Sequence, residues 1–379
     1  MDKTILIGIP CLMIGGTEIQ TLRLVQALVA GNYRCVTVCY FEFDAAMVKQ
    51  FEDAGSEVVC LSPDGTRPET VLGSFRFLQS ALKNVVATYK PDVAHIQYMA
   101  PGALPILILR HYGVKTIVAT LHTDASIYKN SFLVRFLQRH SIRLFTCVTE
   151  IAERSFFGES HLFNDKTTLL RHNHITIHNC LAPNHLFNNH PVETSETAST
   201  VTIGIVARLE LIKGVDLVMP AFAEVKKRFP NCRLLIVGDG KLRTQMEHRQ
   251  HEMGIGDDSV SWTGRVEYSR LPSLYQKMDI VWVPSRSEGF GLSTIEAMSQ
   301  GCAVVVSDAG GLPEIVHDRQ NGLVFQTEDV SDLTAKTVQL IEDRKLLAGI
   351  RDEALHTSHQ FCFESYKYSI LTLYQKIIS

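Results

Sequence analysis

The chain has 379 residues, of which 45% are hydrophobic and 20% charged, with a formal net charge of −3. This length exceeds what one hydrophobic core usually serves, so we expect two domains, and the composition excludes disordered and low-complexity proteins. Residues 1–190 carry 17 Lys and Arg against 15 Asp and Glu, and the remainder carries 20 against 25, so no dense basic region predicts nucleic-acid binding.

Nine cysteines are scattered without a Cys-x-x-Cys pair, which favours reduced thiols over a disulfide framework or a zinc site. The first ten residues run directly into a strand pattern without a basic leader, and the longest apolar run, Ala103–Leu109, is too short to span a bilayer. We therefore expect a cytoplasmic protein that at most touches the inner face of a membrane.

Short runs rich in Val and Ile alternate with longer amphipathic stretches, the pattern of doubly wound parallel sheets with helices on both faces. The strands predicted in the first half are Ile5–Ile9, Cys35–Cys39, Glu57–Leu61, Val93–Ile96, Thr116–Thr120 and Phe145–Val148. Those in the second half are Val201–Val206, Arg233–Val237, Val260–Thr263, Ile280–Val283, Ala303–Val306 and Leu323–Phe325. The polar segment Pro183–Thr200 predicts a linker, and Phe361–Ser379 predicts a final amphipathic helix.

Two glycines, Gly15 and Gly16, follow the first strand and precede an apolar helical pattern. We interpret Thr17 and Gln20 as a capping box, which places the glycines directly before a helix N-terminus. Backbone N–H groups there can approach an anion, because glycine has no side chain and the helix dipole favours negative charge. The motif fits a phosphate site and a simple turn equally well.

Two cations, Arg208 and Lys213, bracket a loop after the first strand of the second half. Ligands of α/β sheets bind at this end of the strands, and an Arg fork with a Lys point charge suits a diphosphate. Spacing alone equally describes two solvated surface cations.

The segment Pro284–Ala297 combines a loop with two glycines, two carboxylates and the start of a helix near Leu292. Glu288 is expected in the loop, near a bound sugar, and Glu296 one turn into the helix, where it could accept hydrogen bonds from ribose hydroxyls. The backbone N–H groups expected to face phosphates are those of Phe290, Gly291 and Leu292.

The spacing Glu288-x7-Glu296, with Arg208 and Lys213 upstream, resembles the retaining glycosyltransferases of family 4 (glycosyl transferases group 1). The resemblance implies the GT-B fold, with two Rossmann-like domains facing a central cleft: residues 1–182, rejoined by the last helix 363–379, and residues 183–362. It covers nearly the whole chain, through Gly15-Gly16-Thr17-Glu18, Asp92–Gln97, Leu121-His122-Thr123, Ile177-His178-Asn179, Gly238-Asp239-Gly240 and Gly310–Glu314.

The resemblance also implies roles for single residues. Arg208 and Lys213 would neutralise the donor diphosphate, and Glu288 would contact the transferred sugar. The remaining assignments are ribose binding by Glu296, phosphate contact by Gly15 and Gly16, a position near the reacting sugar for His122, and a backbone contact with the base near Val266.

Two departures from the family pattern affect these expectations. His178-Asn179-Cys180 stands where Pro-Asn-Gly is usual, which leaves a role for Asn179 open. Gln97 stands where a second His is frequent, and this departure concerns the part of the site expected to face the acceptor.

The expected function is transfer of a hexose-type sugar from a UDP- or GDP-linked donor to a glycan or lipid-linked acceptor, in cell-surface polysaccharide or glycolipid synthesis. The sequence has no Asp-x-Asp motif, so we expect no metal and no cofactor, and the protein's own cations would stabilise the leaving diphosphate. A GT-B epimerase or hydrolase and a non-catalytic nucleotide-sugar binding protein stay open. A nicotinamide dehydrogenase is disfavoured, because neither half has Gly-x-Gly-x-x-Gly after a strand.

The segment Lys129–Leu144 offers a hypothesis of weak contact with an anionic membrane. Arg135, Arg139 and Arg143 recur every four residues and would form a basic stripe beside apolar side chains on one helix. The alternative is an ordinary amphipathic helix whose apolar side packs on the sheet.

Overall fold

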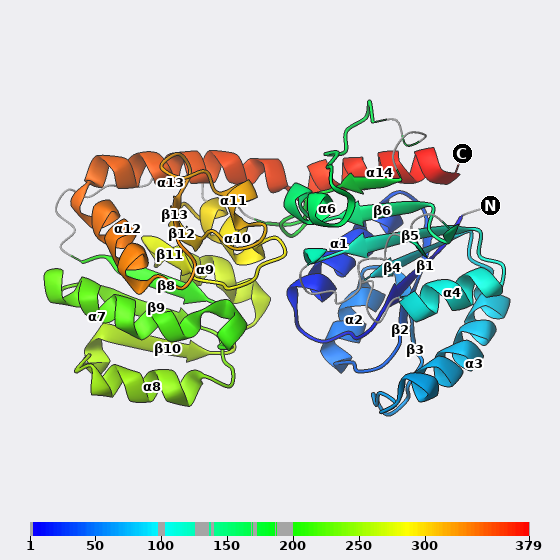
Figure 1. Ribbon diagram of the computed structural model, residues 1–379, viewed down its shortest axis with the longest axis horizontal. Coiled ribbons are helices and arrows are strands. Elements are labelled where there is room, and N and C mark those ends of the chain that lie inside the picture. The colour runs from blue at the N-terminus through cyan, green and yellow to red at the C-terminus, as the bar shows by residue number, and fades with distance from the viewer. Residues whose placement is uncertain are drawn as a thin grey trace. The chain divides into compact units, whose positions relative to one another are not determined.

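The computed structural model describes residues 3–97, 103–125, 136–137, 140–167, 169, 173–185, 187 and 200–378. The chain divides into two compact units, Met1–Pro183 with Phe363–Ser379, and Asn184–Cys362. Most of the expected linker Pro183–Thr200 lies outside the described residues. Each unit is an α/β fold with one parallel sheet, as the alternating pattern predicted (Figure 1).

The N-terminal unit contains a seven-stranded sheet in the order β3-β2-β1-β4-β5-β6-β7. All six predicted strands are present, and their ends agree to within one residue. The unpredicted edge strand β7 has only three residues, too few to show a pattern. The strands are β1 Thr4–Ile9, β2 Arg34–Cys39, β3 Ser56–Cys60, β4 Val93–Gln97, β5 Thr116–Leu121, β6 Leu144–Cys147 and β7 His174–Thr176.

Helices cover both faces of this sheet. They are α1 Gly16–Ala30, α2 Ala45–Asp53, α3 Val71–Tyr89, α4 Ala103–His111, α6 Glu150–Phe157 and α14 Phe363–Ile378. One apolar core joins the sheet to α3, α4 and α6, and the other joins it to α1, α2 and α14. This two-sided cover explains why β1 and β4 are buried throughout, and why β1 has an almost entirely apolar sequence.

The C-terminal unit contains a six-stranded sheet in the order β10-β9-β8-β11-β12-β13. All six strands match predicted ones: β8 Thr202–Val206, β9 Arg233–Val237, β10 Val260–Gly264, β11 Ile280–Val283, β12 Ala303–Ser307 and β13 Leu323–Phe325. The helices are η2 Leu211–Lys213, η3 Val215–Leu217, α7 Val218–Arg228, α8 Arg243–Glu252, η4 Asp257–Ser259, η5 Tyr268–Arg270, α9 Leu271–Tyr275, α10 Leu292–Ser299, α11 Leu312–Ile315, α12 Val330–Glu342, α13 Arg344–Ser358 and η6 His359–Phe361.

Most of the segment Lys129–Leu144 lies outside the described residues. The proposed stripe cannot include Arg143, which is not helical. It directly precedes β6, and its amide donates to the carbonyl oxygen of Ile117 at 2.8 Å, so β-sheet pairing fixes its backbone. Leu137 is fully buried in the core, as the ordinary packing alternative requires.

Candidate active site

Both sheets have a point where the strand order reverses direction. In the C-terminal unit the chain moves outward from β8 to β10 and then returns to place β11 on the other side of β8. The loops after β8 and β11 therefore leave the sheet in opposite directions, which opens a crevice where α/β proteins bind ligands. Arg208 and Lys213 follow β8, and Glu288 follows β11.

Lys213 and Glu288 form an ion pair at this reversal point. Lys213 Nζ lies 2.7 Å from Glu288 Oε2, and the two side chains are 23% and 14% exposed. The Ser285 hydroxyl donates to the same carboxylate oxygen at 3.1 Å. Lys213 is therefore not the solvated cation that its spacing alone allowed.

A glycine lets the two loops approach each other closely enough for this pair. Gly214 has φ 64°, and a Cβ added there would lie 1.8 Å from the carbonyl oxygen of Pro284. Any other residue would push the β8 loop away from the β11 loop. Close backbone packing therefore sets the position of Lys213.

The Gly310-Gly311 motif supports Glu288 from another side. The Gly311 amide donates to the Glu288 carbonyl oxygen at 2.9 Å. Gly310 has φ 56°, and a Cβ there would lie 2.0 Å from the same oxygen. The loop after β12 thus holds the backbone of the proposed sugar-binding carboxylate.

Arg208 has a more open environment than Lys213. Its side chain is 59% exposed and pairs with Glu210 at 2.8 Å. The loop after β9 supports its backbone, because a Cβ on Gly238 would lie 1.9 Å from the carbonyl oxygen of Ala207. Arg208 is consequently placed at the strand end while its side chain can reorient.

Glu296 is the fifth of the eight residues of α10 and is buried, with 7% exposure. Its carboxylate accepts hydrogen bonds from Tyr268 at 2.9 Å and from Tyr275 at 3.1 Å. Burial, and then the Glu296 charge, raise the pKa of the Tyr275 hydroxyl well above its ordinary value, so this tyrosine remains a donor. The two tyrosines were missed in the sequence because they have no fixed spacing to the carboxylate.

The start of α10 agrees with the prediction at Leu292. Gly291 is its N-cap, with φ 104°. A Cβ on this glycine would lie 2.7 Å from Leu312 Cδ2. Phe290 is buried, and its ring packs edge-on against Phe361 at 5.6 Å, so this residue contributes its backbone and a core contact.

Arg286 is a further residue of the site that no sequence motif indicated. Its guanidinium binds both carboxylate oxygens of Asp216, at 2.7 and 2.9 Å, and also pairs with Glu328. Burial alone would raise the Asp216 pKa, but the hydrogen bonds and charge of Arg286, a backbone hydrogen bond and the charge of Arg249 together lower it. Since Arg286 lies two residues before Glu288 and Asp216 three after Lys213, this bidentate contact braces the two loops together.

In the N-terminal unit, the glycines directly precede a helix as expected. Gly15 is the N-cap of α1, and Gly16 is its first residue. The predicted capping box is wrong, because Gln20 instead uses its amide to bind the backbone of Cys180, donating at 2.6 Å and accepting at 3.1 Å. Buried backbone groups need hydrogen-bond partners, and Gln20 supplies them to both the N–H and the C=O of Cys180.

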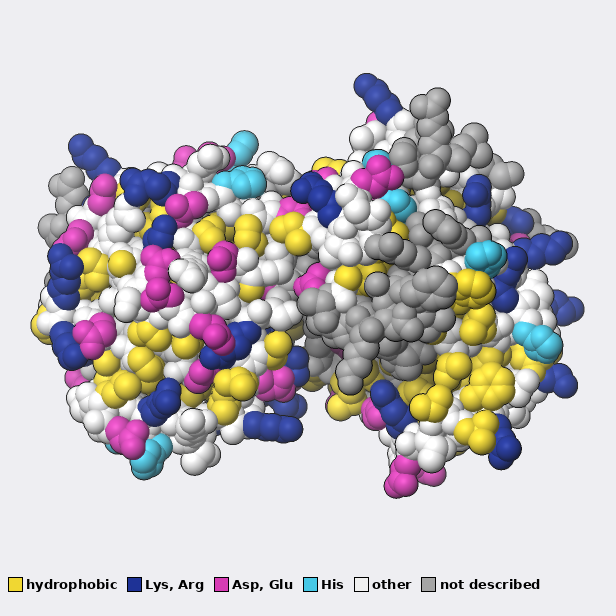
Figure 2. Space-filling model, viewed as in Figure 1, with side chains coloured by type: hydrophobic (Ala, Val, Ile, Leu, Met, Phe, Trp, Pro, Cys, Tyr) yellow, Lys and Arg dark blue, Asp and Glu magenta, His cyan; other side chains and the backbone are white. Residues whose placement is uncertain are grey.

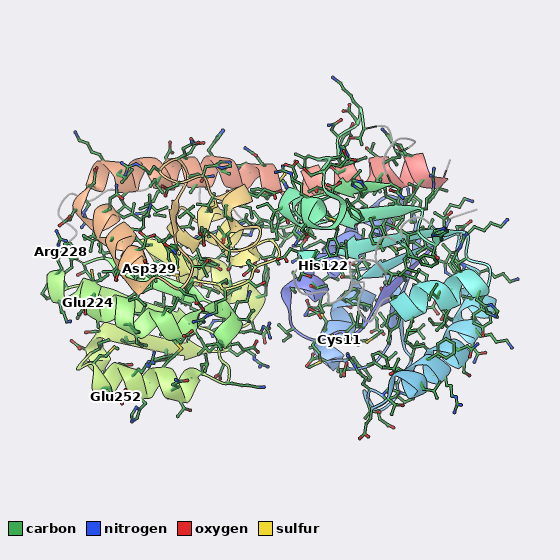
Figure 3. The ribbon with its side chains drawn as sticks, viewed as in Figure 1. Cys11, His122, Glu224, Arg228, Glu252 and Asp329 are labelled. Atoms are coloured by element: carbon green, nitrogen blue, oxygen red, sulfur yellow. The ribbon has the colours of Figure 1, made fainter. Side chains whose placement is uncertain are left out.

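An acidic side chain adjoins the glycine loop. The Cys11 thiol donates to Glu18 at 3.3 Å, and a Cβ on Gly15 would lie 2.4 Å from the Glu18 carboxylate (Figure 3). Burial, followed by the Glu18 charge, raises the pKa of Cys11 to about 12. Cys11 is therefore a neutral thiol at physiological pH.

His122 follows β5 and is buried at the carboxyl end of the sheet (Figure 3). Its Nε2 donates to Gln97 Oε1 at 2.7 Å, so the residue that replaces the family's second His orients it. Burial lowers the His122 pKa to about 3, which makes the ring neutral at pH 7. His122 can thus act through a neutral imidazole but not through a positive charge.

Both ring nitrogens of His95 are hydrogen-bonded within the core, as expected for a residue with a structural role. Its ring nitrogens bond the hydroxyls of Tyr374 at 2.7 Å and Thr120 at 2.6 Å, which links α14 to β5. Burial lowers its pKa to about 3. His95, His122 and Asn179 line a cavity of about 20 Å³, a size that suits a single water molecule.

The structure therefore brings Lys213 together with Glu288 and gives Glu296 two tyrosine partners, while Arg208 pairs with Glu210. Val266 is half-buried in the loop between β10 and η5. Gly15, Gly16 and His122 belong to the other unit, the glycines at the start of α1 and the histidine directly after β5. Basic and acidic side chains are interspersed on the face of each unit in Figure 2. No helix in the described part of the chain is long and apolar enough to cross a membrane.

Comparisons with known proteins agree with this arrangement. The family model for glycosyl transferases group 1 matches residues 189–357, and that for glycosyltransferase family 4 matches residues 14–160. An uncharacterised glycosyltransferase of Methanocaldococcus jannaschii is 25% identical over 78% of each chain. The D-inositol 3-phosphate glycosyltransferase of Segniliparus rotundus is 29% identical over 47% of this chain, but the match spans only 40% of that relative.

Among solved structures, Anabaena Alr3699/HepE in complex with UDP and glucose has a TM-score of 0.79 and 18% identity, with 99% of this chain and 100% of that chain covered. A sucrose-phosphate synthase from Thermosynechococcus elongatus gives 0.77 and 16%, with 99% and 98% covered. Both likenesses concern the fold. The two family matches, which together span most of the sequence, and the two parallel-sheet units show that the chain belongs to the group 1, family 4-like glycosyltransferases of the GT-B type.

Proposed function

We propose that the protein transfers a hexose from a UDP- or GDP-linked donor to a hydroxyl of a glycan or lipid-linked acceptor, with retention and without a metal ion. The ion pair between Lys213 and Glu288 carries this proposal. The bond that breaks joins the anomeric carbon to the diphosphate, so a cation for the phosphate and a carboxylate for the sugar must lie side by side. Their 2.7 Å separation provides that adjacency.

Charge supports the same assignment. Lys213 and Arg208 each pair with a carboxylate of their own unit. A donor diphosphate would offer these cations stronger charge-assisted bonds and would bind with them at the end of β8. Negative charge grows on the diphosphate as the bond breaks, and preorganised cations stabilise that charge.

The transfer needs no separate base, because the leaving phosphate accepts the proton of the acceptor hydroxyl. The bond from the anomeric carbon to the phosphate oxygen breaks, the acceptor oxygen attacks the same face of the sugar, and the acceptor proton moves to the departing phosphate. The products are the glycosylated acceptor and the nucleoside diphosphate. His122 would lie near the sugar as a neutral hydrogen-bonding group, consistent with its lowered pKa.

The UDP-linked donor is the first to test, because the fold neighbour named above holds UDP and glucose. Cell-surface polysaccharide or glycolipid synthesis, with the enzyme acting from the cytoplasm, is the proposed setting. A membrane contact near Lys129–Leu144 would serve a lipid-linked acceptor. That segment lies mostly outside the described residues, and vesicle binding by an Arg135→Glu, Arg139→Glu variant tests the contact.

The proposal is tested first by donor binding. A ligand that binds only the folded protein at 100 times its Kd adds about 2.7 kcal/mol to the free energy of unfolding. We expect UDP-glucose, UDP-galactose or GDP-mannose to raise the unfolding temperature, and nucleoside diphosphate release to require an acceptor. Absence of stabilisation by any sugar nucleotide would contradict the donor class, and equal release without an acceptor would favour a hydrolase.

A further inference from the structure

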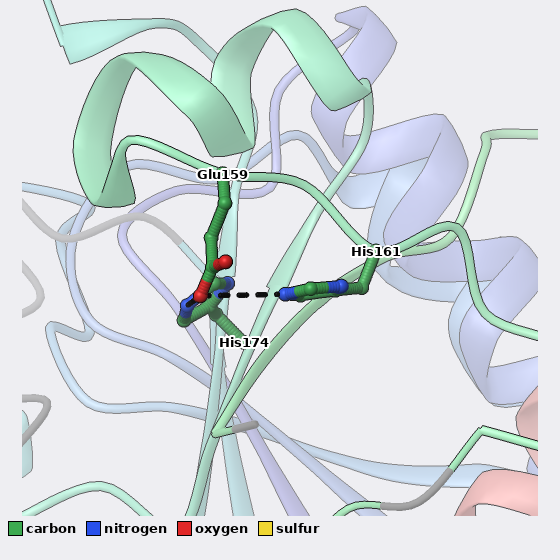
Figure 4. Close-up of side chains that lie close together, drawn as sticks. All are labelled: Glu159, His161 and His174. Atoms are coloured by element: carbon green, nitrogen blue, oxygen red, sulfur yellow. Dashed lines mark ion pairs between the residues drawn. The ribbon is translucent and has the colours of Figure 1, made fainter. Parts of the chain in front are cut away.

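Another group of side chains lies at the β7 edge of the N-terminal sheet. Glu159, His161 and His174 point toward one another there (Figure 4). One ligand atom from each residue lies within 4.8 Å of the other two. Glu159 Oε1 is 3.5 Å from His161 Nε2 and 3.9 Å from His174 Nε2.

The backbone holds this arrangement in place. Helix α6 ends at Phe157, and its C-cap Gly158, with φ of 86°, turns the chain so that Glu159 lies immediately after the cap. The Thr176 amide donates to the His161 carbonyl oxygen at 2.9 Å, which docks the segment carrying His161 onto the strand that carries His174. All three side chains are thus attached to regular structure or to its immediate end.

A buried carboxylate, Glu153, orients the ring of His174 and binds the backbone of His161. Glu153 is fully buried, and its Oε1 accepts a hydrogen bond from His174 Nδ1 at 2.6 Å. Its Oε2 accepts from the backbone amide of His161 at 3.0 Å and from the hydroxyl of Thr176. A second carboxylate that binds the far nitrogen of a histidine is the usual support of a metal ligand, because it fixes the tautomer and raises the basicity of the other nitrogen.

The contact with Glu153 also decides which nitrogen of His174 faces the cluster. Because Nδ1 is bonded to Glu153, Nε2 is directed toward the Glu159 carboxylate, 3.9 Å away. A divalent cation between these two atoms would bind both of them. The ring of Phe157 stacks on His174 at 4.4 Å and 12°, which restricts the orientation of the imidazole.

We propose that Glu159, His161 and His174 bind a divalent transition-metal ion, with Zn²⁺ as the best fit to their chemistry. Two imidazoles and a carboxylate form a common three-ligand zinc set, with the fourth position taken by water. Bonds of about 2.0–2.2 Å at tetrahedral angles place ligand atoms roughly 3.3–3.5 Å apart. The two distances from Glu159, 3.5 and 3.9 Å, are close to this range, and all three ligand atoms lie within 4.8 Å of one another, so the side chains would close around the ion.

The site would stabilise the edge of the sheet rather than take part in glycosyl transfer. Strand β7 has three residues and pairs on one side with β6 alone among the named strands. A metal bound to His174, His161 and Glu159 would tie this short strand to the end of α6. The inference is independent of the proposed function, since its test measures metal binding and stability.

The experiment uses tag-free, full-length protein that has been treated with EDTA and dialysed. Calorimetric titration with Zn²⁺ should show one ion per chain, and the unfolding temperature should rise with Zn²⁺. His161→Ala and Glu159→Gln remove ligands that are not fully buried, so both variants should fold, yet lose at least 10- to 100-fold in affinity. Glu153→Gln, which acts through His174, should lower the affinity within that range while preserving the stoichiometry.

Two controls separate this site from other metal binding. On α8, His248 makes a comparable contact of 3.3 Å with Glu252, which is labelled in Figure 3, and among the described residues no third ligand joins this pair. His248→Ala should therefore leave the affinity unchanged. Co²⁺ substitution should give a spectrum without the thiolate charge-transfer band that cysteine ligands produce. Failure of the wild-type protein to bind stoichiometric Zn²⁺, unchanged binding in both His161→Ala and Glu159→Gln, or a thiolate band would each overturn the proposal.

Discussion

Lys213 Nζ and Glu288 Oε2 lie 2.7 Å apart although 75 residues separate them in the sequence. Their loops follow β8 and β11, which are neighbours in the sheet only because the strand order reverses between them. A bound diphosphate would compete for the lysine of this pair, and a bound sugar would compete for the carboxylate. Substitutions of Lys213 and of Glu288 should therefore affect binding and turnover differently.

Lys213→Ala should lower kcat/KM by roughly 10²–10³-fold, because it removes a preorganised cation from the leaving group. The side chain is only 23% exposed, so the free energy of unfolding should also fall, by about 1–3 kcal/mol for the carboxylate left behind. Steady-state kinetics well below the unfolding temperature separate the two effects. Lys227→Ala, which removes an exposed lysine paired with Glu224 on α7, is the matched control and should change neither quantity (Figure 3). Near-normal turnover in Lys213→Ala would remove this lysine from the site.

Glu288→Gln should separate binding from turnover. It removes the sugar contact, which should lower kcat by about 10- to 100-fold. It also frees Lys213 from its partner, so the affinity for UDP alone should stay the same or rise. Calorimetry with UDP and turnover with the donor measure the two effects. A parallel loss of UDP affinity would show that Glu288 positions the lysine rather than contacting the sugar.

Glu296→Gln keeps the shape of the side chain but weakens charge-assisted hydrogen bonds to ribose. Nucleotide affinity should fall by roughly 1.5–3 kcal/mol. Tyr268→Phe removes one of the two donors that orient this carboxylate and should produce a smaller loss in the same direction. Calorimetry that shows unchanged affinity in Glu296→Gln would exclude the ribose assignment.

The buried histidines make stability depend on pH. The pKa values of His95 and His122 are lowered from 6.5 to about 3, so below pH 6.5 the unfolded chain takes up protons that the folded protein does not. The free energy of unfolding should therefore fall as the pH drops from 6.5 toward 3, by on the order of 2 kcal/mol per histidine at pH 5. Urea unfolding at pH 5 and 7.5 should show a smaller difference for His122→Gln than for the wild type. An equal difference would mean that His122 is protonated normally in the folded state.

Glycosyl transfer should survive exhaustive EDTA treatment, because the protein's own cations are expected to neutralise the diphosphate. The measurement is initial rate at a temperature well below unfolding, so that a stabilising metal elsewhere in the N-terminal unit does not affect the result. Activity that is lost and then restored specifically by Mg²⁺ or Mn²⁺ would overturn the metal-free mechanism.

The sequence by itself determined the two parallel sheets. Their strands are buried on both faces, and such strands appear as short Val- and Ile-rich runs, which is why Ile5–Ile9 and Ile280–Val283 could be recognised without a partner. It also determined the start of α10 at Leu292, because a glycine N-cap directly before an apolar helical pattern is a local signal. Local patterns failed where a long-range contact prevailed: Gln20 binds the backbone of Cys180 instead of capping α1.

Only the tertiary structure decided what each polar residue contacts. Spacing described Lys213 and Arg208 alike, yet Lys213 is largely covered and paired with Glu288, whereas Arg208 is 59% exposed. The bracing Arg286, the two tyrosines on Glu296 and the cluster of Glu159 with two histidines were also not apparent from the sequence. The physical reason is that secondary structure follows from interactions among neighbours in the chain, while ion pairs and metal ligands depend on which strand ends the sheet order brings together.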